Sequence, residues 1–243
     1  MRTWGITDVG LVRSENQDAY DIRVMAGYTV AVVCDGMGGP MGGKRASTLA
    51  VELFDREMEA SLKEGMSSSQ LTQVMSYSAA LANEAIYCEA QEDSAYEYMG
   101  TTMVSVAATA TEVQILNVGD SRAYHIDRDG IQQITKDHSV VEGLVESGNI
   151  THEQAKNHPQ RNLITKALGP EPSVQPDCFE VFWKQGDFVL LCSDGLVNTV
   201  SDQEILFEVI HNGEPDTCLE RLLAMSKQRG APDNVTAVLL MNI

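Results

Sequence analysis

Basic residues are scarce in this chain. Its 243 residues include 17 lysines and arginines against 35 aspartates and glutamates, so the formal net charge is −18. A field of this sign repels nucleic acids and anionic membrane surfaces, and we expect neither as a partner. The excess acid fits either a solvated surface or a site that collects cations, and charge alone does not separate the two.

Long apolar runs are missing as well. No stretch reaches the roughly 20 apolar residues of a membrane-spanning helix, and the first residues, MRTWGITDVG, lack the apolar segment of a secretory signal. The five cysteines are odd in number and have no CxxC spacing, which argues against a disulfide framework and a zinc cluster. We therefore expect a cytoplasmic protein, and a monomer by default.

Several motifs of hydrolases and metal enzymes are absent. The sequence contains neither GxSxG nor HExxH, and no two of its five histidines are four residues apart. Residues 125–136 have the length of an EF-hand calcium loop, but His125 and Lys136 occupy positions where that loop needs carboxylates. These absences leave the aspartates as candidates for a metal site.

Seven runs rich in valine, isoleucine and threonine predict β-strands. They cover residues 28–34, 103–109, 112–118, 122–126, 130–135, 187–192 and 235–241. The short connections at 109–111 and 127–130 have turn chemistry and predict two hairpins. We therefore expect antiparallel pairing.

Helical periodicity predicts helices at residues 44–63, 69–91, 202–211 and 215–228. The more polar segment 137–169 has only a weak helical pattern, and we expect it to be appended to the sheet. Helices grouped in sequence must pack on a sheet, so the expected fold class is α+β. Because no repeat or linker interrupts the chain, we expect one domain over residues 1–243.

Three of the predicted strands end in an aspartate. Asp35 and Asp194 each follow a strand and precede a glycine, and Asp120 follows the strand at 112–118. Asp233 stands just before the last strand, and Asp18 lies in the early segment RSENQD. Aspartate is common in turns, so each one alone has an ordinary explanation. If these strands are neighbours in the sheets, the five carboxylates meet at one edge.

Carboxylates gathered in one place repel each other unless protons or cations neutralise them. Oxygen ligands from aspartate, backbone carbonyls and water are the ones that Mg²⁺ and Mn²⁺ prefer. Gly36 adds to the pattern, because a residue without a Cβ lets the backbone approach an ion and offer its carbonyl oxygen. The sequence therefore predicts a divalent metal site around Asp35 and Gly36.

A competing hypothesis comes from the glycine-rich stretch VCDGMGGPMGGK at residues 33–44. Its end has the glycine and lysine spacing of a phosphate-binding loop, and an apolar strand precedes it. The match then fails, because Arg45 stands where the loop needs serine or threonine, and Pro40 removes a backbone amide. We expect the glycines instead to turn the chain away from Asp35 and into a helix that begins near Lys44.

Short motifs occur in a fixed order along nearly the whole chain. They lie at residues 10–13, 16–18, 35–39, 100–102, 118–122, 137–139, 163–169, 193–196 and 233–236. By this ordered set the chain resembles the metal-dependent protein serine/threonine phosphatases of the PPM (PP2C-type) family, in their compact bacterial form. The resemblance implies a PP2C-like β-sandwich of two antiparallel sheets flanked by helices. It also implies a small flap at about residues 137–169 that influences substrate choice.

The resemblance implies a set of metal ligands. Asp35 would bridge two divalent ions, Mn²⁺ or Mg²⁺. Asp194 and Asp233 would bind the first ion, and the carbonyl oxygen of Gly36 would bind the second. Asp120, together with Asp194, matches the site of a third ion in bacterial members.

Two residues near the N-terminus match other parts of the family's machinery. Arg13 corresponds to the arginine that binds the phosphate, and Asp18 would act mainly through metal-bound water. The family hydrolyses phosphoserine and phosphothreonine on proteins by direct attack of a metal-bridging hydroxide. Met37 departs from eukaryotic relatives, whose histidine there protonates the leaving group, so water would supply that proton. Pro40 and Lys44 replace a histidine and a glutamate of the bacterial loop, which removes no metal ligand.

A non-enzymatic alternative stays open at this point. The same fold could serve as a catalytically weak or inactive regulatory module that binds phosphoproteins. Such a module would be expected to have lost one or more of the aspartates, and all of them are present. Phosphorylated proteins are the expected partners, and the resemblance, rather than any residue, implies a cognate serine/threonine kinase.

Overall fold

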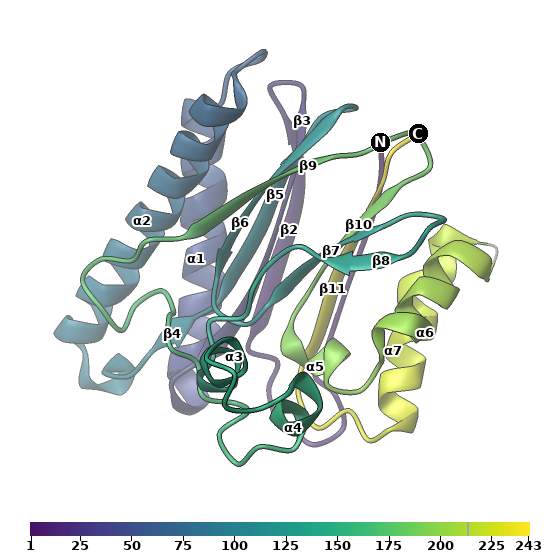
Figure 1. Cartoon of the computed structure of the whole chain (residues 1–243). Helices are drawn as coiled ribbons and strands as arrows, with labels where there is room; N and C mark the ends of the chain where they lie inside the picture. The colour runs from purple at the N-terminus through teal and green to yellow at the C-terminus, as the bar shows by residue number, and fades with distance from the viewer. Residues whose placement is uncertain (213) are drawn as a thin grey trace.

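The computed structural model describes residues 1–212 and 214–243, and its strands form two antiparallel sheets (Figure 1). The first sheet has the strand order β1 (Arg2–Asp8), β11 (Val235–Met241), β10 (Phe188–Cys192), β7 (Arg122–Ile126) and β8 (Ile131–Gln133). The second has the order β2 (Asp18–Met25), β3 (Tyr28–Met37), β5 (Met103–Ala108), β6 (Glu112–Val118) and β9 (Asp177–Phe182), and β4 (Gly100–Thr101) pairs with β3.

Helices cover the outer face of each sheet (Figure 1). The long helices α1 (Gly39–Ser61) and α2 (Ser68–Glu92) pack on the second sheet, and η1 (Ser94–Tyr96) follows them. The first sheet is covered by α5 (Asp194–Val197), α6 (Asp202–Leu206), η2 (Phe207–His211), η3 (Pro215–Thr217) and α7 (Cys218–Gln228). This arrangement confirms the predicted α+β sandwich. None of the described helices has the length and apolar character needed to cross a membrane.

Three clusters of buried apolar side chains separate the layers. Val33 and Leu191 belong to the cluster between the two sheets. Phe54 and Met58 of α1 belong to the cluster between the helix pair and the second sheet, and Leu222 of α7 belongs to the third cluster. A strand that is buried on both faces is apolar along its whole length, so its sequence signal is strong.

All seven predicted strands are present, and the two predicted hairpins are β5–β6 and β7–β8. Four further strands were missed, namely the two-residue β4 and the longer β1, β2 and β9. The three longer ones lie at an edge of their sheet, and their residues are mostly half-buried or exposed. An edge strand contacts the core less than a central one does, so its apolar pattern is diluted by polar residues.

The helix predictions hold except at the start of the first helix. That helix begins at Gly39, after the N-cap residue Gly38 with φ of 112°, and not near Lys44. Gly42 and Gly43 are therefore helical, and the expected bend over all the glycines is wrong. A helix usually disfavours glycine, so another requirement must explain these residues.

The polar segment between β8 and β9 forms two short helices, α3 (Val140–Glu146) and α4 (His152–Lys156). Figure 1 shows them at one end of the sandwich, below the sheets in that view, while the two chain termini lie at the other end. An isolated bridge of Ser139 with Ile164 brings the two ends of the segment together, and a bridge of Leu168 with Thr101 joins it to β4.

Candidate active site

The five aspartates singled out from the sequence come together at the end of the sandwich that bears α3 and α4. Asp35 lies near the end of β3 and is paired in register with Asp18 at the start of β2. Asp194 follows β10, Asp120 lies between β6 and β7, and Asp233 stands two residues before β11. Antiparallel strands alternate in direction, so the end of one strand and the start of its neighbour share an edge.

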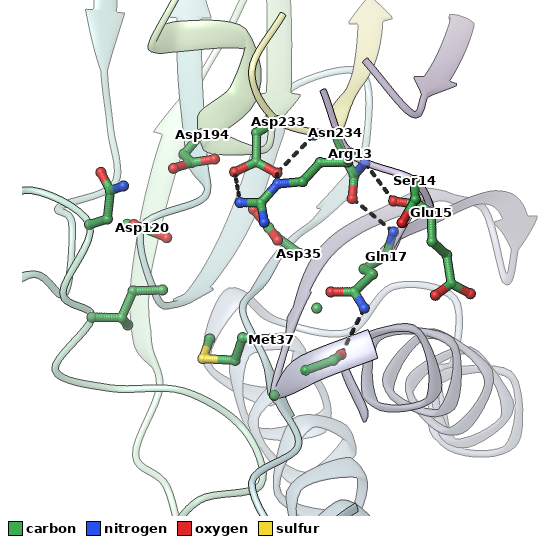
Figure 2. A pocket seen from close by; sticks show the side chains of 15 residues that line it. Arg13, Ser14, Glu15, Gln17, Asp35, Met37, Asp120, Asp194, Asp233 and Asn234 are labelled. Carbon is green, nitrogen blue, oxygen red and sulfur yellow. Dashed lines mark hydrogen bonds and ion pairs between the residues drawn. The ribbon is translucent and has the colours of Figure 1, made fainter. Parts of the chain in front are cut away.

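These residues surround a cavity of about 470 Å³. Asp35, Asp120, Asp194 and Asp233 line it together with Arg13, and Figure 2 shows the guanidinium of Arg13 beside the carboxylate of Asp233. Asp18 lies behind this wall and is 1% exposed. Apart from Arg13, no lysine or arginine is among the described residues that line the cavity.

Asp18 has one oxygen held and one available. Its Oδ2 accepts a hydrogen bond of 2.8 Å from the hydroxyl of Ser193, whereas its Oδ1 is buried and has no partner among the described residues. A buried, unpartnered carboxylate oxygen is unfavourable unless a proton, a water or a cation satisfies it. Oδ1 of Asp18 is therefore an oxygen that can bind a divalent cation or one of the cation's water ligands.

The backbone of Asp35 is held rigidly. Its N–H donates to the Thr102 hydroxyl at 2.9 Å, and its carbonyl oxygen accepts from the backbone N–H of Thr102 and the hydroxyl of Thr101, both at 2.9 Å. The Thr102 hydroxyl in turn contacts the Ser121 hydroxyl at 2.7 Å. The Gly-Thr-Thr motif at 100–102 therefore fixes the strand end that presents the Asp35 carboxylate.

Close packing explains the glycines of α1. A Cβ on Gly36 would lie 2.0 Å from the carbonyl oxygen of Gly43, and a Cβ on Gly43 would lie 2.6 Å from Oε1 of Gln17. The first turns of α1 thus contact the end of β3 directly. Lys44, the lysine of the rejected phosphate-loop hypothesis, donates from Nζ to the backbone oxygen of Asp18 at 3.1 Å.

The electrostatics of the cluster are those of crowded, buried acids. Burial raises the pKa of Asp18 to about 6 and that of Asp120 to about 7, and repulsion from neighbouring aspartates adds to both shifts. The pKa of Asp35 is raised well above its ordinary value, and that of Asp194 is raised too, again by burial first and neighbouring carboxylates second. Such a cluster fits divalent cations, whose charge offsets both effects.

Arg13 and Asp233 form a two-pronged ion pair. Nε of Arg13 donates to Oδ1 of Asp233 at 2.9 Å, and a terminal nitrogen donates to Oδ2 at 2.7 Å. A guanidinium has five N–H donors, so about three of them stay available to another anion. The Arg13 side chain is 57% exposed at the cavity, where an incoming phosphate could reach it.

Asn234 was not assigned a role from the sequence, but it connects the loop that carries Arg13 with the segment that carries Asp233. Its Oδ1 accepts from the backbone N–H of Gln17 at 2.8 Å, and its Nδ2 donates to the carbonyl oxygens of Val9 at 2.9 Å and Glu15 at 3.0 Å. The loop that carries Arg13 is thereby attached to the residue after Asp233. The sequence signal was the Asp-Asn pair just before the last strand.

Another group of possible metal ligands lies elsewhere. Of the histidine, cysteine and acidic side chains that the structure describes, His125, Asp127 and Asp187 are the group with three ligand atoms within 4.8 Å of one another. Asp187 precedes β10 whereas Asp194 follows it, so the group is at the far end of the strand. Its atoms already have partners, because Asp187 accepts from His125 at 3.2 Å and from the Lys184 backbone at 2.8 Å.

No three of the aspartates around the cavity are gathered as tightly as that group in the described part of the chain. A single ion held directly by three carboxylates would need such spacing. Ions that share a carboxylate and keep several water ligands do not. The wider spacing is therefore compatible with hydrated divalent ions.

The cavity wall also bears on the leaving group. Met37 lines the cavity and cannot donate a proton, and no histidine is among the described lining residues. On the side of the flap, Asn162 and Ile164 complete the wall. Neither a histidine nor Met37 can therefore supply a proton at this wall.

Comparisons with known proteins agree with this geometry. A family model described as "Protein phosphatase 2C" matches residues 12–237. The chain is 34% identical over 237 residues to the protein phosphatase PhpP of Streptococcus pneumoniae, covering 97% of this chain and 95% of that one. It is 38% identical over 234 residues to the serine/threonine protein phosphatase PstP of Mycobacterium tuberculosis, covering 96% of this chain and 43% of that one.

The fold comparison gives the same family. The structure of the serine/threonine phosphatase Stp1 from Staphylococcus aureus superposes with a TM-score of 0.93 at 36% identity, covering 98% of this chain and 94% of that one. Both the sequence and the fold are thus matched over nearly the full length. The chain therefore belongs to the protein phosphatase 2C family, and it is a protein serine/threonine phosphatase.

Proposed function

We propose that this chain hydrolyses phosphoserine and phosphothreonine on other proteins with the help of Mn²⁺ or Mg²⁺. The observation that carries the proposal is the convergence of four aspartates and one exposed arginine on a single cavity, with Asp18 buried behind its wall. The acids supply oxygen ligands for cations, and the arginine supplies a fork for a phosphate. Phosphorylated proteins are the proposed partners, together with a cognate serine/threonine kinase.

The proposed ligand set follows the roles expected from the sequence. Asp35, Asp194 and Asp233 would hold one divalent ion, and Asp35 with the carbonyl oxygen of Gly36 would hold a second. Asp120 and Asp194 would hold a third. When bound, divalent cations lower the pKa of water enough for it to attack phosphorus at neutral pH.

The chain's own groups hold these side chains in place. Asn198 donates from Nδ2 to Oδ2 of Asp194 at 2.9 Å, as Ser193 does to Asp18, so each carboxylate is oriented by one of its oxygens. Such partners of ligands commonly raise metal affinity 10- to 100-fold. Asp18 acts from behind the wall, through water.

Arg13 binds the substrate in this proposal. Its planar guanidinium can keep its two bonds to Asp233 and donate further N–H groups to phosphate oxygens. The phosphate is thereby placed over the aspartate cluster. Water donates the proton that the leaving serine or threonine oxygen requires, since Met37 has none to give.

The test is hydrolysis of a phosphothreonine peptide in Mn²⁺, with and without EDTA. We expect turnover that EDTA abolishes, and no turnover by Asp35→Asn or Asp194→Asn. Asp187→Asn, at the far end of β10, is the matched control and should retain activity. Turnover that persists in EDTA would defeat the mechanism, and peptide binding without turnover would point to the non-enzymatic module.

Cellular setting and assembly are also proposals. We propose a cytoplasmic monomer in which residues 1–243 form one domain with a flap at about 137–169. All five cysteines are free, which is compatible with a reducing compartment. Size-exclusion chromatography with light scattering tests the monomer.

A further inference from the structure

The Gly119–Asp120 turn is held from outside the cavity by His138. The backbone N–H of Gly119 donates to Nδ1 of His138 at 3.0 Å, and the backbone N–H of His138 donates to the Gly119 carbonyl oxygen at 2.9 Å. Gly119 has φ of 109° and would place a Cβ 2.6 Å from Thr102, so the turn has little freedom. The residue directly after it is Asp120, which lines the cavity.

These contacts fix the tautomer of the imidazole ring. Nδ1 accepts a hydrogen bond, so the ring proton of the neutral form is on Nε2. Nε2 lies 3.1 Å from Oδ2 of Asp177, to which it donates. The pKa of Asp177 is lowered, because hydrogen bonds from Lys166 and His138 outweigh the effect of burial, so this acceptor is an ionised carboxylate.

His138, at the start of the flap, and Asp177 also contact residues at the end of the flap. Oδ1 of Asp177 accepts from Nζ of Lys166 at 2.9 Å, and the carbonyl oxygen of His138 accepts from the backbone N–H of Thr165 at 2.8 Å. Ile164, the residue before Thr165, lines the catalytic cavity. Two hydrogen bonds thus connect Thr165, next to Ile164, through His138 to Gly119, next to Asp120.

His138 stands between two hollows. It lines a second cavity of about 500 Å³ with Thr165, Lys166 and Asp177, whereas Asp120 lines the catalytic one. The contacts between the flap and the ring therefore border open space. They can loosen without repacking the apolar core, while the bond to Gly119 lies on the other side of the ring.

We propose that His138 is a positioning residue whose two ring nitrogens have separate functions. Nδ1 sets the Gly119–Asp120 turn, which carries the proposed ligand of the third ion, and Nε2 fastens the start of the flap to Asp177, the first residue of β9. Metal binding at Asp120 and docking of a protein substrate on the flap are therefore coupled through one ring. The proposal rests on the proposed function, because it assigns Asp120 to an ion.

Two substitutions separate the two nitrogens. In His138→Asn the side-chain oxygen can take the position of Nδ1 and accept from Gly119, while the bond to Asp177 is lost. In His138→Gln the longer amide can replace Nε2 toward Asp177, while the acceptor for Gly119 is lost. His211→Gln, on an exposed histidine of η2, is the matched control.

The measurements include readouts that do not need turnover. Mn²⁺ is titrated calorimetrically into EDTA-treated, dialysed protein, and amide hydrogen exchange is followed over residues 160–168. We expect His138→Gln to weaken the weakest Mn²⁺ site about 10-fold and to leave the flap protected. We expect His138→Asn to bind Mn²⁺ like the parent, to exchange faster in the flap, and to raise KM for a phosphoprotein but not for p-nitrophenyl phosphate.

The opposite pattern, equal effects of both variants, or no effect of either would overturn the proposal. Far-ultraviolet circular dichroism and thermal melting of each variant identify a general loss of folding, and Asp177→Asn then serves as a second test of the flap contact. Its expected result is that of His138→Asn. If the parent binds Mn²⁺ but hydrolyses no phosphopeptide, the proposed function fails while the coupling can still be measured by calorimetry and exchange.

Discussion

Arg13 and Asp233 are 220 residues apart in the chain and are joined by two parallel hydrogen bonds of 2.9 and 2.7 Å. The pair brings the proposed phosphate ligand next to a proposed metal ligand. The charge of Asp233 keeps the guanidinium in place, and the fork of Arg13 in turn orients the carboxylate. This ion pair thus aligns the group proposed to bind the phosphate with a group proposed to bind a metal ion.

Arg13→Lys should lower kcat/KM for a phosphothreonine peptide by about 10- to 100-fold. Lysine keeps the charge but loses the planar fork, and a hydrogen bond to a charged group contributes about 1.5–3 kcal/mol. Steady-state kinetics in saturating Mn²⁺ measure the change. Arg128→Lys, on the exposed turn between β7 and β8, is the control, and equal kinetics for both variants would remove Arg13 from phosphate binding.

Gly36→Ala should destabilise the protein by about 1–3 kcal/mol, because the new methyl would lie 2.0 Å from the backbone oxygen of Gly43, which cannot move without shifting α1. Urea denaturation in EDTA gives the change without the contribution of metal binding. Gly130→Ala is the matched control, since nothing lies within 4 Å of its Cβ. A Gly36→Ala variant as stable as the parent would mean that α1 does not pack closely on β3.

Asn234→Ala removes three hydrogen bonds that attach the Arg13 loop to the start of β11. We expect a loss of about 1–3 kcal/mol in the free energy of unfolding, since the partners are left unsatisfied, and a fall in kcat/KM. Denaturation and peptide kinetics check the two effects. An exposed control, Asn212→Ala, should change stability by less than about 0.5 kcal/mol, and a similar small value for Asn234→Ala would contradict its role.

Asp55 gives a prediction about pH. It is 2% exposed on α1, and burial together with a hydrogen bond to Asp21 raises its pKa from 3.8 to about 7. Between these two values the folded state binds more protons than the unfolded state, so stability falls as pH rises and levels off above about 7. Arg23, whose Nε lies 3.4 Å from Oδ2 of Asp55, lowers this pKa and so keeps the loss smaller than burial alone would make it.

Asp55→Asn should therefore become more stable relative to the parent as pH rises from 5 to 8. The difference grows by at most about 3 kcal/mol between these pH values, from the roughly two pH units between 5 and the folded pKa of about 7 at 1.36 kcal/mol each. Urea denaturation at both pH values in EDTA measures it. Asp129→Asn, on the exposed turn, should follow the parent at both pH values, and an Asp55→Asn curve parallel to the parent's would show that Asp55 is ionised at neutral pH.

Central strands and long helices could be read from the sequence because local physics determines them. The strands at 112–118, 122–126 and 235–241 were predicted with the bounds that the structure has. The edge strands β1, β2 and β9 could not be read in the same way, because each is a strand by virtue of one bonded neighbour rather than an apolar pattern. Gly42 and Gly43 of α1 were misread because their cause, the packing against Met99 and Gly36, is a contact between segments.

The candidate site divides in the same manner. The sequence by itself determined the chemistry: which strands carry aspartates, that Met37 cannot donate a proton, and that motifs in this order indicate a metal-dependent phosphatase. The tertiary structure decided which oxygen of Asp18 is available, that Arg13 pairs with Asp233, and that His138 joins Asp120 to the flap. Residue types and strand periodicity are local properties, whereas hydrogen-bond partners far apart in the chain exist only once the sheets have formed.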